Sequence, residues 1–398
     1  MTSTHEARTG AAREDDPSRS TGSASERDRR PGTHGSTPSV ERPLDAPRPA
    51  PPRTKRARAT LLAIGLAIAL LAGCLLSAMI GQLYIPPGEV VGFVLGGLGI
   101  DWLPGPSHEF GAAALAEVRF PRIVLTLLVG AALAVAGALM QGIFGNPLAE
   151  PGSVGVSSGA AVGASFSILF GLTFLGPFTT PAFAFVAGLV TTFLVYALSR
   201  TGGRTEVITL ILTGVAVNAV CGALIAFITF KVPTQAREQI VFWQMGSLNG
   251  SRWEQVLLVA PLIVVGAALA IAMGRKLDLL SLGEKAARHV GVDVERVRVL
   301  SMVYVALLVS AAVAFAGIIA FVGLVVPHII RMIIGPAHRA LLLCSVLGGA
   351  FLLTMADLAA RTLVEFADLP IGMLTSLIGG PFFFYLIRRS RTKGGGWQ

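Results

Sequence analysis

Two arginines, Arg119 and Arg122, are the residues of this 398-residue chain whose type and spacing best suit charge-assisted binding. Pro121 lies between them and suits the first turn of a helix, where its missing N–H leaves no bond unmade. Residues three positions apart share one helix face, so both guanidinium groups point the same way. Snorkelling to a membrane surface is the simple interpretation, and pairing with carboxylates of a partner protein is the alternative.

A second segment, Leu282–Gly291, combines glycines with small and charged residues. Residues 284–290 fit a helix of two turns, with Gly283 near its start and Gly291 in the left-handed position that often ends a helix. A solvated connector between larger elements is the simplest interpretation. A short helix that docks on another protein is the alternative, because small residues share one face and charges the other.

No group of residues predicts catalysis or metal binding. His328 has no second His, Cys or carboxylate at the spacing of metal ligands, which favours a structural role. Cys74, Cys221 and Cys344 lie in apolar runs and are typical of small core residues. The sequence lacks a GxxxxGK[ST] phosphate loop, so we expect no ATP hydrolysis by this chain. We expect no catalytic residue, no metal site and no bound cofactor.

The elements that must position these residues are apolar. Hydrophobic residues make up 53% of the chain and charged residues 14%, whereas soluble domains usually carry about 25% charge. Residues 1–58 hold 12 basic and 8 acidic residues, which leaves 35 charged residues for the other 340 positions. So little charge excludes a soluble enzyme and a disulfide-bonded secreted domain, and the lack of a clustered basic patch excludes a nucleic-acid binder. The composition predicts an all-α, polytopic membrane protein.

The chain divides into a polar head, a membrane domain and a short tail. Residues 1–57 are rich in Pro and Arg and lack apolar periodicity, which predicts a disordered cytoplasmic head rather than a signal peptide. Residues 58–390 form the predicted membrane domain and residues 391–398 a cytoplasmic tail. About ten transmembrane helices are predicted from the apolar runs 59–81, 120–143, 153–171, 181–199, 206–230, 254–274, 299–319, 320–334, 340–357 and 370–388. The run 320–334 is short and contains Pro327, which predicts a half-length or kinked helix.

The distribution of basic residues predicts that both termini are cytoplasmic. Counted from Arg53, this orientation places 18 Lys and Arg residues inside and six outside. The six are Arg119, Arg122, Lys231, Arg237, Arg252 and Arg361. Arg119 and Arg122 therefore form a pair on the side that should be poor in positive charge, which favours a partner with carboxylates.

The predicted membrane interior lacks ionisable residues. No Asp, Glu, Lys, Arg or His occurs from Pro151 to Ser199 or in residues 299–327. We therefore expect no ionisable group at mid-depth. Because ion-coupled transporters place such groups within the membrane, their absence argues against ion-coupled transport. Any uphill transport must then draw its energy from another subunit.

Small residues at helical spacing suggest close helix approach. Gly155, Gly159 and Gly163 form such a stripe, and ordinary helix packing is its simplest interpretation. The alternative is that this helix lines a solute cavity. Ser157 and Ser158 on the same predicted helix are consistent with that alternative.

Five sequence blocks, in order, resemble the permease subunits of ABC importers for iron–siderophore complexes, haem and cobalamin, the FecCD-type family. The blocks are RxPR from Arg119, GAALAxxGxxxQxxxxNPLAxPGxxGxxxGA from Gly130, LGxxxAxxxG from Leu282, GxxxFVGLxxPHxxR from Gly317 and LPxGxxTxxxGxPxFxxL from Leu369. The resemblance covers about residues 59–390. Two features depart from the family pattern: the long head, and Gly145, where an arginine or lysine is common.

The resemblance implies the ten-helix fold of type II ABC importer permeases in the cytoplasmic membrane. It implies three kinds of partner within that lipid bilayer or beside it: a second permease subunit, identical or paralogous, two cytoplasmic ATPases that use ATP and Mg²⁺, and an external substrate-binding protein. A ferric siderophore is the expected cargo, and haem and cobalamin stay open. An ATP-independent secondary transporter or channel is the alternative from a different class.

Residue by residue, the resemblance implies three sites. Arg119, Arg122 and Arg361 resemble the arginines that receive glutamates of the binding protein. The second site resembles the coupling helix that seats in the ATPase, and comprises Leu282, Gly283, Glu284, Ala286, Ala287 and Gly291. The expected lining of the translocation path or its gate is Gln141, Asn146, Pro147, Ser157, Ser158 and Gly159.

Overall fold

The computed structural model describes residues 52–392, apart from 202–203 and 365–366. These described residues belong to one compact unit. The predicted head, 1–57, lies outside the described residues except for 52–57, which belong to the first helix, α1 (Pro52–Met79). The predicted tail, 391–398, lies outside them except for its first two residues, which end the last helix.

Ten apolar helices form the membrane domain within the described part of the chain, and each overlaps one predicted run. They are α1, α4 (Phe120–Phe144), α5 (Val156–Leu169), α6 (Thr179–Leu198), α7 (Val207–Lys231), α9 (Trp253–Ala272), α12 (Val294–Ala316), α13 (Val322–Ile334), α14 (His338–Ala360) and α15 (Ile371–Thr392). Seven are long and apolar enough to cross a membrane, while α5, α13 and the apolar part of α15 are shorter. The predicted all-α, polytopic fold is therefore confirmed, and α13 is the predicted short helix.

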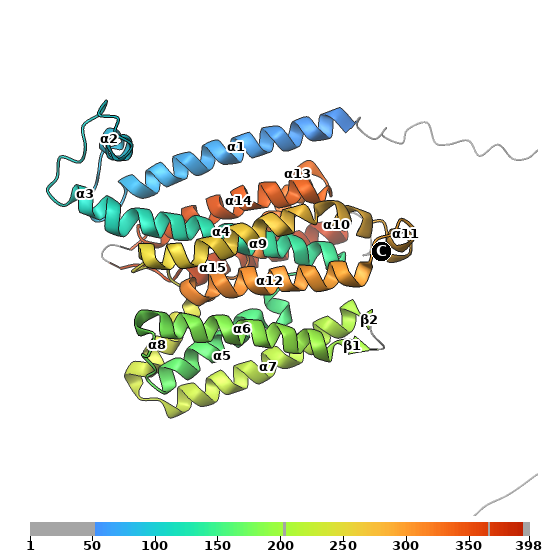
Figure 1. Ribbon diagram of the computed structural model, residues 1–398. Coiled ribbons are helices and arrows are strands. Elements are labelled where there is room, and N and C mark those ends of the chain that lie inside the picture. Colours follow the sequence, from blue (N-terminus) through green and yellow to red (C-terminus); the bar gives the residue numbers. More distant parts are fainter. Residues whose placement is uncertain (1–51, 202–203, 365–366, 393–398) are drawn as a thin grey trace, which may run out of the picture. The chain divides into compact units, whose positions relative to one another are not determined.

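Smaller elements connect the apolar helices at both ends of the bundle. One end carries α2 (Pro87–Gly97), α3 (Gly111–Ala113) and α8 (Thr234–Met245), and the π-helical turn Ala114–Arg119 joins α3 to α4. The other end carries α10 (Gly274–Leu280), α11 (Glu284–His289) and the antiparallel pair β1 (Arg200–Thr201) and β2 (Arg204–Thr205). Short 3₁₀ turns lie at Pro151–Val154 and Gly176–Phe178. Because the second end gathers the basic residues, it is the cytoplasmic end (Figure 1).

The core is built around α4, which packs against α9, α12, α13 and α14. Its glycines let neighbouring backbones approach closely. A Cβ atom at Gly130 would overlap the carbonyl oxygen of Gly349 on α14, and one at Gly137 would overlap that of Gly323 on α13. Small residues on α4 thus serve helix packing, as expected inside a membrane, where apolar lipid gives helices no hydrophobic reason to associate.

The chain between α12 and α13 breaks at Phe321, the one described residue other than glycine with a positive φ, 67°. Its backbone N–H donates to Oε1 of Glu150, 3.0 Å away. Gly323 lies two residues further on and packs against the carbonyl oxygen of Leu133, near the middle of α4, and against Pro151. The expectation that no ionisable group reaches mid-depth is therefore wrong at Glu150. This residue seemed to lie in a loop between helices, but the loop re-enters the bundle.

Two spanning helices, α1 and α7, have the smallest buried share of their apolar windows, at 6% and 17%. On α7 the exposed apolar side chains include Leu212, Leu224 and Phe227. Such helices must be covered by lipid or by another subunit.

Candidate functional site

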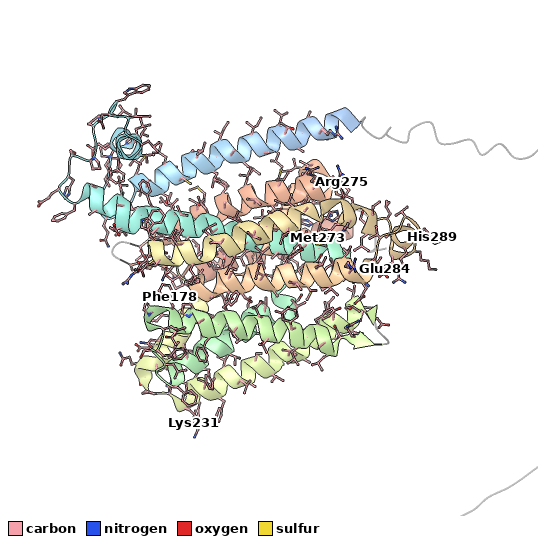
Figure 2. All side chains as sticks on the ribbon, viewed as in Figure 1. Phe178, Lys231, Met273, Arg275, Glu284 and His289 are labelled. Carbon is pink, nitrogen blue, oxygen red and sulfur yellow. The ribbon has the colours of Figure 1, made fainter. Side chains whose placement is uncertain are left out.

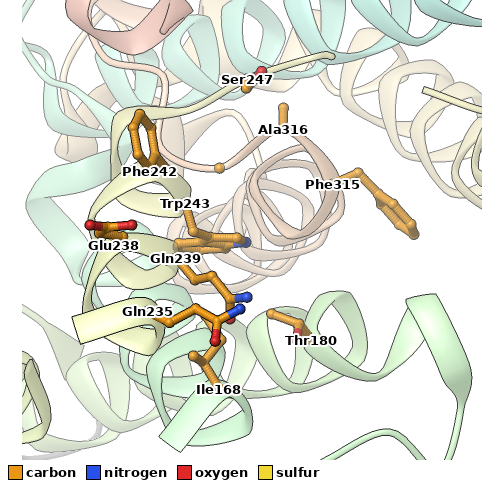
Figure 3. A pocket seen from close by; sticks show the side chains of 11 residues that line it. Ile168, Thr180, Gln235, Glu238, Gln239, Phe242, Trp243, Ser247, Phe315 and Ala316 are labelled. Carbon is orange, nitrogen blue, oxygen red and sulfur yellow. The ribbon is translucent and has the colours of Figure 1, made fainter. Parts of the chain in front are cut away.

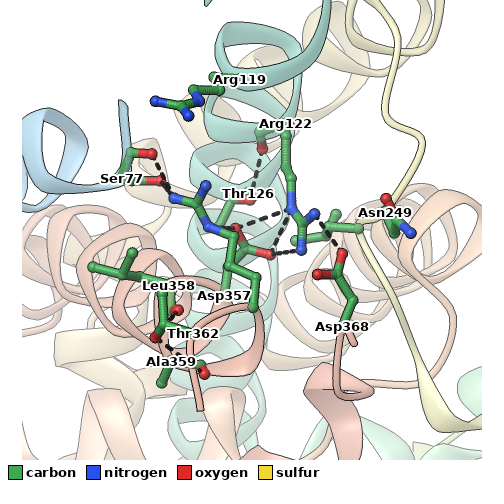
Figure 4. Close-up of polar contacts among 12 residues, drawn as sticks. Ser77, Arg119, Arg122, Thr126, Asn249, Asp357, Leu358, Ala359, Thr362 and Asp368 are labelled. Carbon is green, nitrogen blue, oxygen red and sulfur yellow. Dashed lines mark hydrogen bonds and ion pairs between the residues drawn. The ribbon is translucent and has the colours of Figure 1, made fainter. Parts of the chain in front are cut away.

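Arg122 holds two elements together at the outer end of the bundle (Figure 4). Its Nη2 lies 2.9 Å from Oδ1 of Asp357 on α14, and its Nε donates to both carboxylate oxygens of Asp357 at 3.0 and 3.2 Å. Its Nη1 donates to Oδ2 of Asp368 at 2.8 Å. Asp357 is only 1% exposed, so this is a buried, bidentate ion pair rather than a surface contact.

The other two arginines converge on the same place. Arg361 donates from Nη2 to the carbonyl oxygen and hydroxyl of Ser77 on α1, at 2.5 and 2.7 Å, and its Nε lies 3.8 Å from Asp357. Arg119 donates to the backbone carbonyls of Ala78, Met79 and Leu83. We name Arg119, Arg122, Arg361, Asp357 and Asp368 the outer arginine cluster. Its three cations and two anions leave one net positive charge.

The three arginines and Asp368 of the outer arginine cluster line a recess of about 300 Å³, together with residues that include Gln82 and Asn249. The structure thus brings together three arginines that the sequence places up to 242 positions apart. It also gives each of them partners within the chain, so none stands free as a surface ligand. The cluster fastens α1, α4 and α14 to one another, a role that the sequence interpretation did not include.

The predicted cytoplasmic helix is confirmed as α11. Gly283 precedes it with a φ of 103°, and Gly291 follows with a φ of 84°, so both glycines occupy conformations that other residues avoid. Within this segment Ala287 is fully buried, while Ala286 is exposed. The helix lies at the cytoplasmic end, where Figure 2 labels its ends, Glu284 and His289.

Exposed apolar residues flank α11 on both sides. Leu282 is 70% exposed and Val290 is 64% exposed, although each lies next to a glycine rather than within a lipid-facing helix. Apolar side chains of this kind at a water-facing end are a feature of protein interaction sites.

Arg298, near the start of α12, connects α11 to Thr205, which lies just before the N-terminus of α7 and is here called the foot of α7. Its Nη2 donates to Oε1 of Glu284 on α11, and its Nη1 donates to the carbonyl oxygen of Thr205 at 3.0 Å. Thr205 lies two residues before α7. We name Glu284, Arg298 and Thr205 the inner link.

Glu295 strengthens the same connection from one helical turn earlier. Its carboxylate accepts from the backbone N–H of Thr205 at 3.2 Å, from the Thr205 hydroxyl at 2.6 Å and from the Tyr196 hydroxyl at 3.0 Å. Three polar contacts thus hold Thr205, at the foot of α7, to α12: two to Glu295 and one to Arg298. No local pattern could predict this arrangement, because Thr205 and Glu295 are 90 residues apart.

The residues expected to line a path lie in two places. Gln141 is buried in α4 and donates from Nε2 to the carbonyl oxygen of Leu324 at 3.1 Å. Asn146 and Pro147 follow α4, and the Asn146 side chain accepts from the backbone N–H of Leu148 at 2.9 Å, which forms a tight turn. These three residues are at the cytoplasmic end of α4.

The remaining three residues lie on α5. The Ser158 hydroxyl lies 2.5 Å from Oδ1 of Asn218 on α7, and Nδ2 of Asn218 donates to the carbonyl oxygen of Gly152. Ser157 is half-buried beside it. Gly159 is buried against α6, where an added Cβ would overlap Thr191, so in this structure it serves helix packing.

A cavity that the sequence did not predict opens at the outer end, between α5, α6, α8 and the end of α12. Its volume is about 530 Å³ (Figure 3). Its lining combines amides and a carboxylate with aromatic rings, and includes Gln235, Glu238, Gln239, Phe242 and Trp243 of α8. Most of these residues belong to a polar helix outside the predicted spans, which is why apolar runs did not reveal it.

No group of three or more His, Cys, Asp or Glu side chains among the described residues could hold a metal ion. The three cysteines are unpaired, and Cys221 and Cys344 are buried.

These features define a class: a multi-pass helical membrane protein with a short, exposed helix at its cytoplasmic end. The chain belongs to the FecCD transport family, which matches residues 69–389. It is thus an ABC importer permease of the cytoplasmic membrane, a non-catalytic membrane subunit.

Individual relatives agree with this assignment. The chain is similar to the hemin transport system permease protein HmuU of Yersinia pestis, with 43% identity over 289 residues that cover 70% of this chain and 84% of the relative. It is similar to the Fe(3+) dicitrate transport system permease protein FecD of Escherichia coli, with 39% identity over 322 residues that cover 81% and 96%. Among solved structures, an ABC transporter of metal-chelate type in an inward-facing conformation has 33% identity and a TM-score of 0.72, covering 83% of this chain and 99% of that chain.

Proposed function

We propose that this chain moves a ferric siderophore-type chelate across the cytoplasmic membrane, driven by ATPases that dock on α11. The observation that carries the proposal is α11 itself. Glycines bracket the helix, the apolar residues Leu282 and Val290 are exposed beside it, and Arg298 ties it to the foot of α7. A helix that is exposed on one side and anchored on the other is suited to pass motion from a partner into the bundle.

Replacing both Leu282 and Val290 by aspartate is expected to remove the ATPase. Each side chain would lose the burial that an ATPase groove provides, about 1.5–3 kcal/mol for a fully buried Leu or Val. We therefore expect at least about a 10-fold loss of co-purified ATPase from membranes that contain both proteins. Leu98→Asp is the matched control, because Leu98 is 72% exposed but lies at the outer end. Unchanged co-purification of the double variant would contradict the docking role of α11.

We further propose that a substrate-binding protein docks over the outer arginine cluster. The net positive charge of the cluster and its recess of about 300 Å³ suit a carboxylate side chain from that partner. Arg119, Arg122 and Arg361 already hold the fold together, so the docking test should add charge at the rim and leave the arginines in place.

Asn249→Glu is expected to weaken the binding protein's affinity about 2- to 5-fold at low salt, through repulsion of its carboxylate. The effect should shrink at high salt because exposed charges are screened. Asn249 is exposed, and Asn249→Gln is the neutral control of equal size to the test residue. Equal affinities of the two variants, measured by surface binding assays on the purified chain, would count against docking at this recess.

The proposed path runs from the outer cavity past α5 and α7 to the cytoplasmic end. The amides and aromatic rings of α8 suit a large chelate, because they offer hydrogen bonds and flat contact beside a single carboxylate, Glu238. Ser157 and Ser158 then lie along α5, and Asn146, Pro147 and Gln141 lie where the path would leave the chain. Haem and cobalamin are the alternative cargoes, and similarity to a hemin permease supports haem as one of them. The second permease subunit would cover α7, the exposed apolar helix.

A further inference from the structure

A second cavity, here called the inner cavity, lies at the cytoplasmic end of the bundle and encloses about 410 Å³. Residues of α4, α10, α12, α13 and α14 line it, together with the loop before α11. Its polar side chains are Gln141, Ser281, Glu284, Arg298, Arg331 and His338. Two arginines and a histidine thus line one partly open cavity.

Several buried polar atoms of this lining have no hydrogen-bond partner within the described part of the chain. They are Nε and Nη2 of Arg331, Nε of Arg298, Nε2 of His338 and Oε1 of Gln141. His338 is 1% exposed and Arg298 is 8% exposed, so bulk water does not reach their side chains freely. A buried polar group without a partner is costly, and a buried guanidinium more so.

The acidic residues nearby are already engaged. Glu284 accepts from Arg298, and Oδ1 of Asp278 accepts from the backbone N–H of His338 at 2.7 Å and lies 2.9 Å from its Nδ1. Arg331 therefore keeps its positive charge without an ion pair among the described residues. Arg298 of α12, Arg331 of α13 and His338 of α14 thus each bring at least one unpartnered nitrogen to the same cavity.

We propose that the inner cavity binds a phosphate group. Arginine forks recognise phosphate through paired, charge-assisted hydrogen bonds. Nε and Nη2 of Arg331 form such a fork without a partner among the described residues, and Nε of Arg298 and Nε2 of His338 are further unpartnered nitrogens of the same lining. The group can belong to an anionic phospholipid of the inner leaflet, since basic pockets between membrane helices on the cytoplasmic side bind lipid headgroups. A free phosphate in the cytoplasm offers the same chemistry.

Gly142 lies in the lining and leaves room for the imidazole of His338 beside α4. A Cβ atom at this position would lie 3.0 Å from Nε2 of His338 and 3.4 Å from Leu277. Gly142→Ala therefore narrows the inner cavity without changing any charge, and alanine favours the helix in which it stands. It provides a second variant that is independent of the arginines.

The test uses the purified full-length chain, delipidated in a phosphate-free detergent. In the first arm, inorganic phosphate is titrated against chloride at equal ionic strength while the unfolding midpoint is measured. In the second arm, phosphatidylglycerol is added and retained lipid is counted by native mass spectrometry. Arg331→Gln and Gly142→Ala are compared with Arg296→Gln, which removes an exposed arginine two residues from Arg298.

We expect wild type and Arg296→Gln to be stabilised by phosphate or to retain phosphatidylglycerol. Arg331→Gln should bind the same probe at least about 10-fold more weakly, which corresponds to the loss of one or two charged hydrogen bonds. Stabilisation by inorganic phosphate identifies a soluble source, and retention of lipid alone identifies a headgroup. Equal binding by Arg331→Gln, or no binding of either probe by wild type, would overturn the proposal. A loss of co-purified ATPase in Arg331→Gln with no probe bound by wild type would instead assign the cavity to the ATPase.

Discussion

Replacing Arg122 by glutamine is expected to lower the unfolding midpoint of the purified chain by about 4–7 °C. Removing one partner of a buried ion pair costs about 3–5 kcal/mol, because the other charge stays buried without compensation. In the variant the Asp357 carboxylate, which is 1% exposed, would lose its bidentate partner. The next basic group is Nε of Arg361, 3.8 Å away. Charge reversal to glutamate would gather three acids in one recess, and we expect it to yield no folded protein.

Two comparisons make this expectation specific. Arg237→Gln removes an exposed arginine at the same end, whose described contact is a hydrogen bond to the carbonyl oxygen of Thr229, and it should shift the midpoint little. Adding Asp357→Asn to Arg122→Gln should restore part of the lost stability, because the uncompensated charge disappears. A midpoint of Arg122→Gln within about 2 °C of wild type would show that the pair does not hold the fold.

Replacing Arg298 by glutamine is expected to uncouple the ATPase from transport. The change breaks the inner link between α11 and the foot of α7, while the exposed face of α11 remains available for docking. Coupling free energies of about 1–3 kcal/mol correspond to about 5- to 150-fold. We expect a loss of this order in stimulation of ATPase activity by the loaded binding protein, with the ATPase still co-purifying.

The conservative variant distinguishes positioning from simple loss of charge. Arg298→Lys keeps the charge but offers a single ammonium in place of two separate guanidinium nitrogens, so it cannot reproduce both contacts. It should therefore couple only partly, whereas Arg296→Gln should couple like wild type. Full coupling by Arg298→Gln would show that motion reaches α7 by another route.

Apolar patterning predicted the membrane domain well because the bilayer requires long apolar helices with internally satisfied backbones. Each of the ten predicted runs overlaps a helix, and Gly283 and Gly291 bracket α11 as expected. The polar helix α8 and the short helix α2 were missed because neither is long and apolar enough to span.

The partners of the arginines could not be predicted, because they depend on tertiary contacts. Arg122 meets Asp357 from 235 residues away, and Arg298 meets Thr205 from 93 residues away. One local signal was present: Asp357 and Arg361 stand four residues apart, a spacing that favours ion pairs on a helix. Glu150 was missed for a different reason, since a re-entrant segment resembles an ordinary loop in sequence.

The central claim is that this chain transports a chelate only when ATPases drive it. The most direct measurement is uptake of a radiolabelled ferric siderophore into proteoliposomes that contain this chain, its ATPase and an external binding protein. We predict accumulation against a gradient with ATP and Mg²⁺ inside, and none with a non-hydrolysable analogue or with the α11 variant Leu282→Asp/Val290→Asp. Uptake at the same rate without ATP would contradict the account and identify a facilitated transporter.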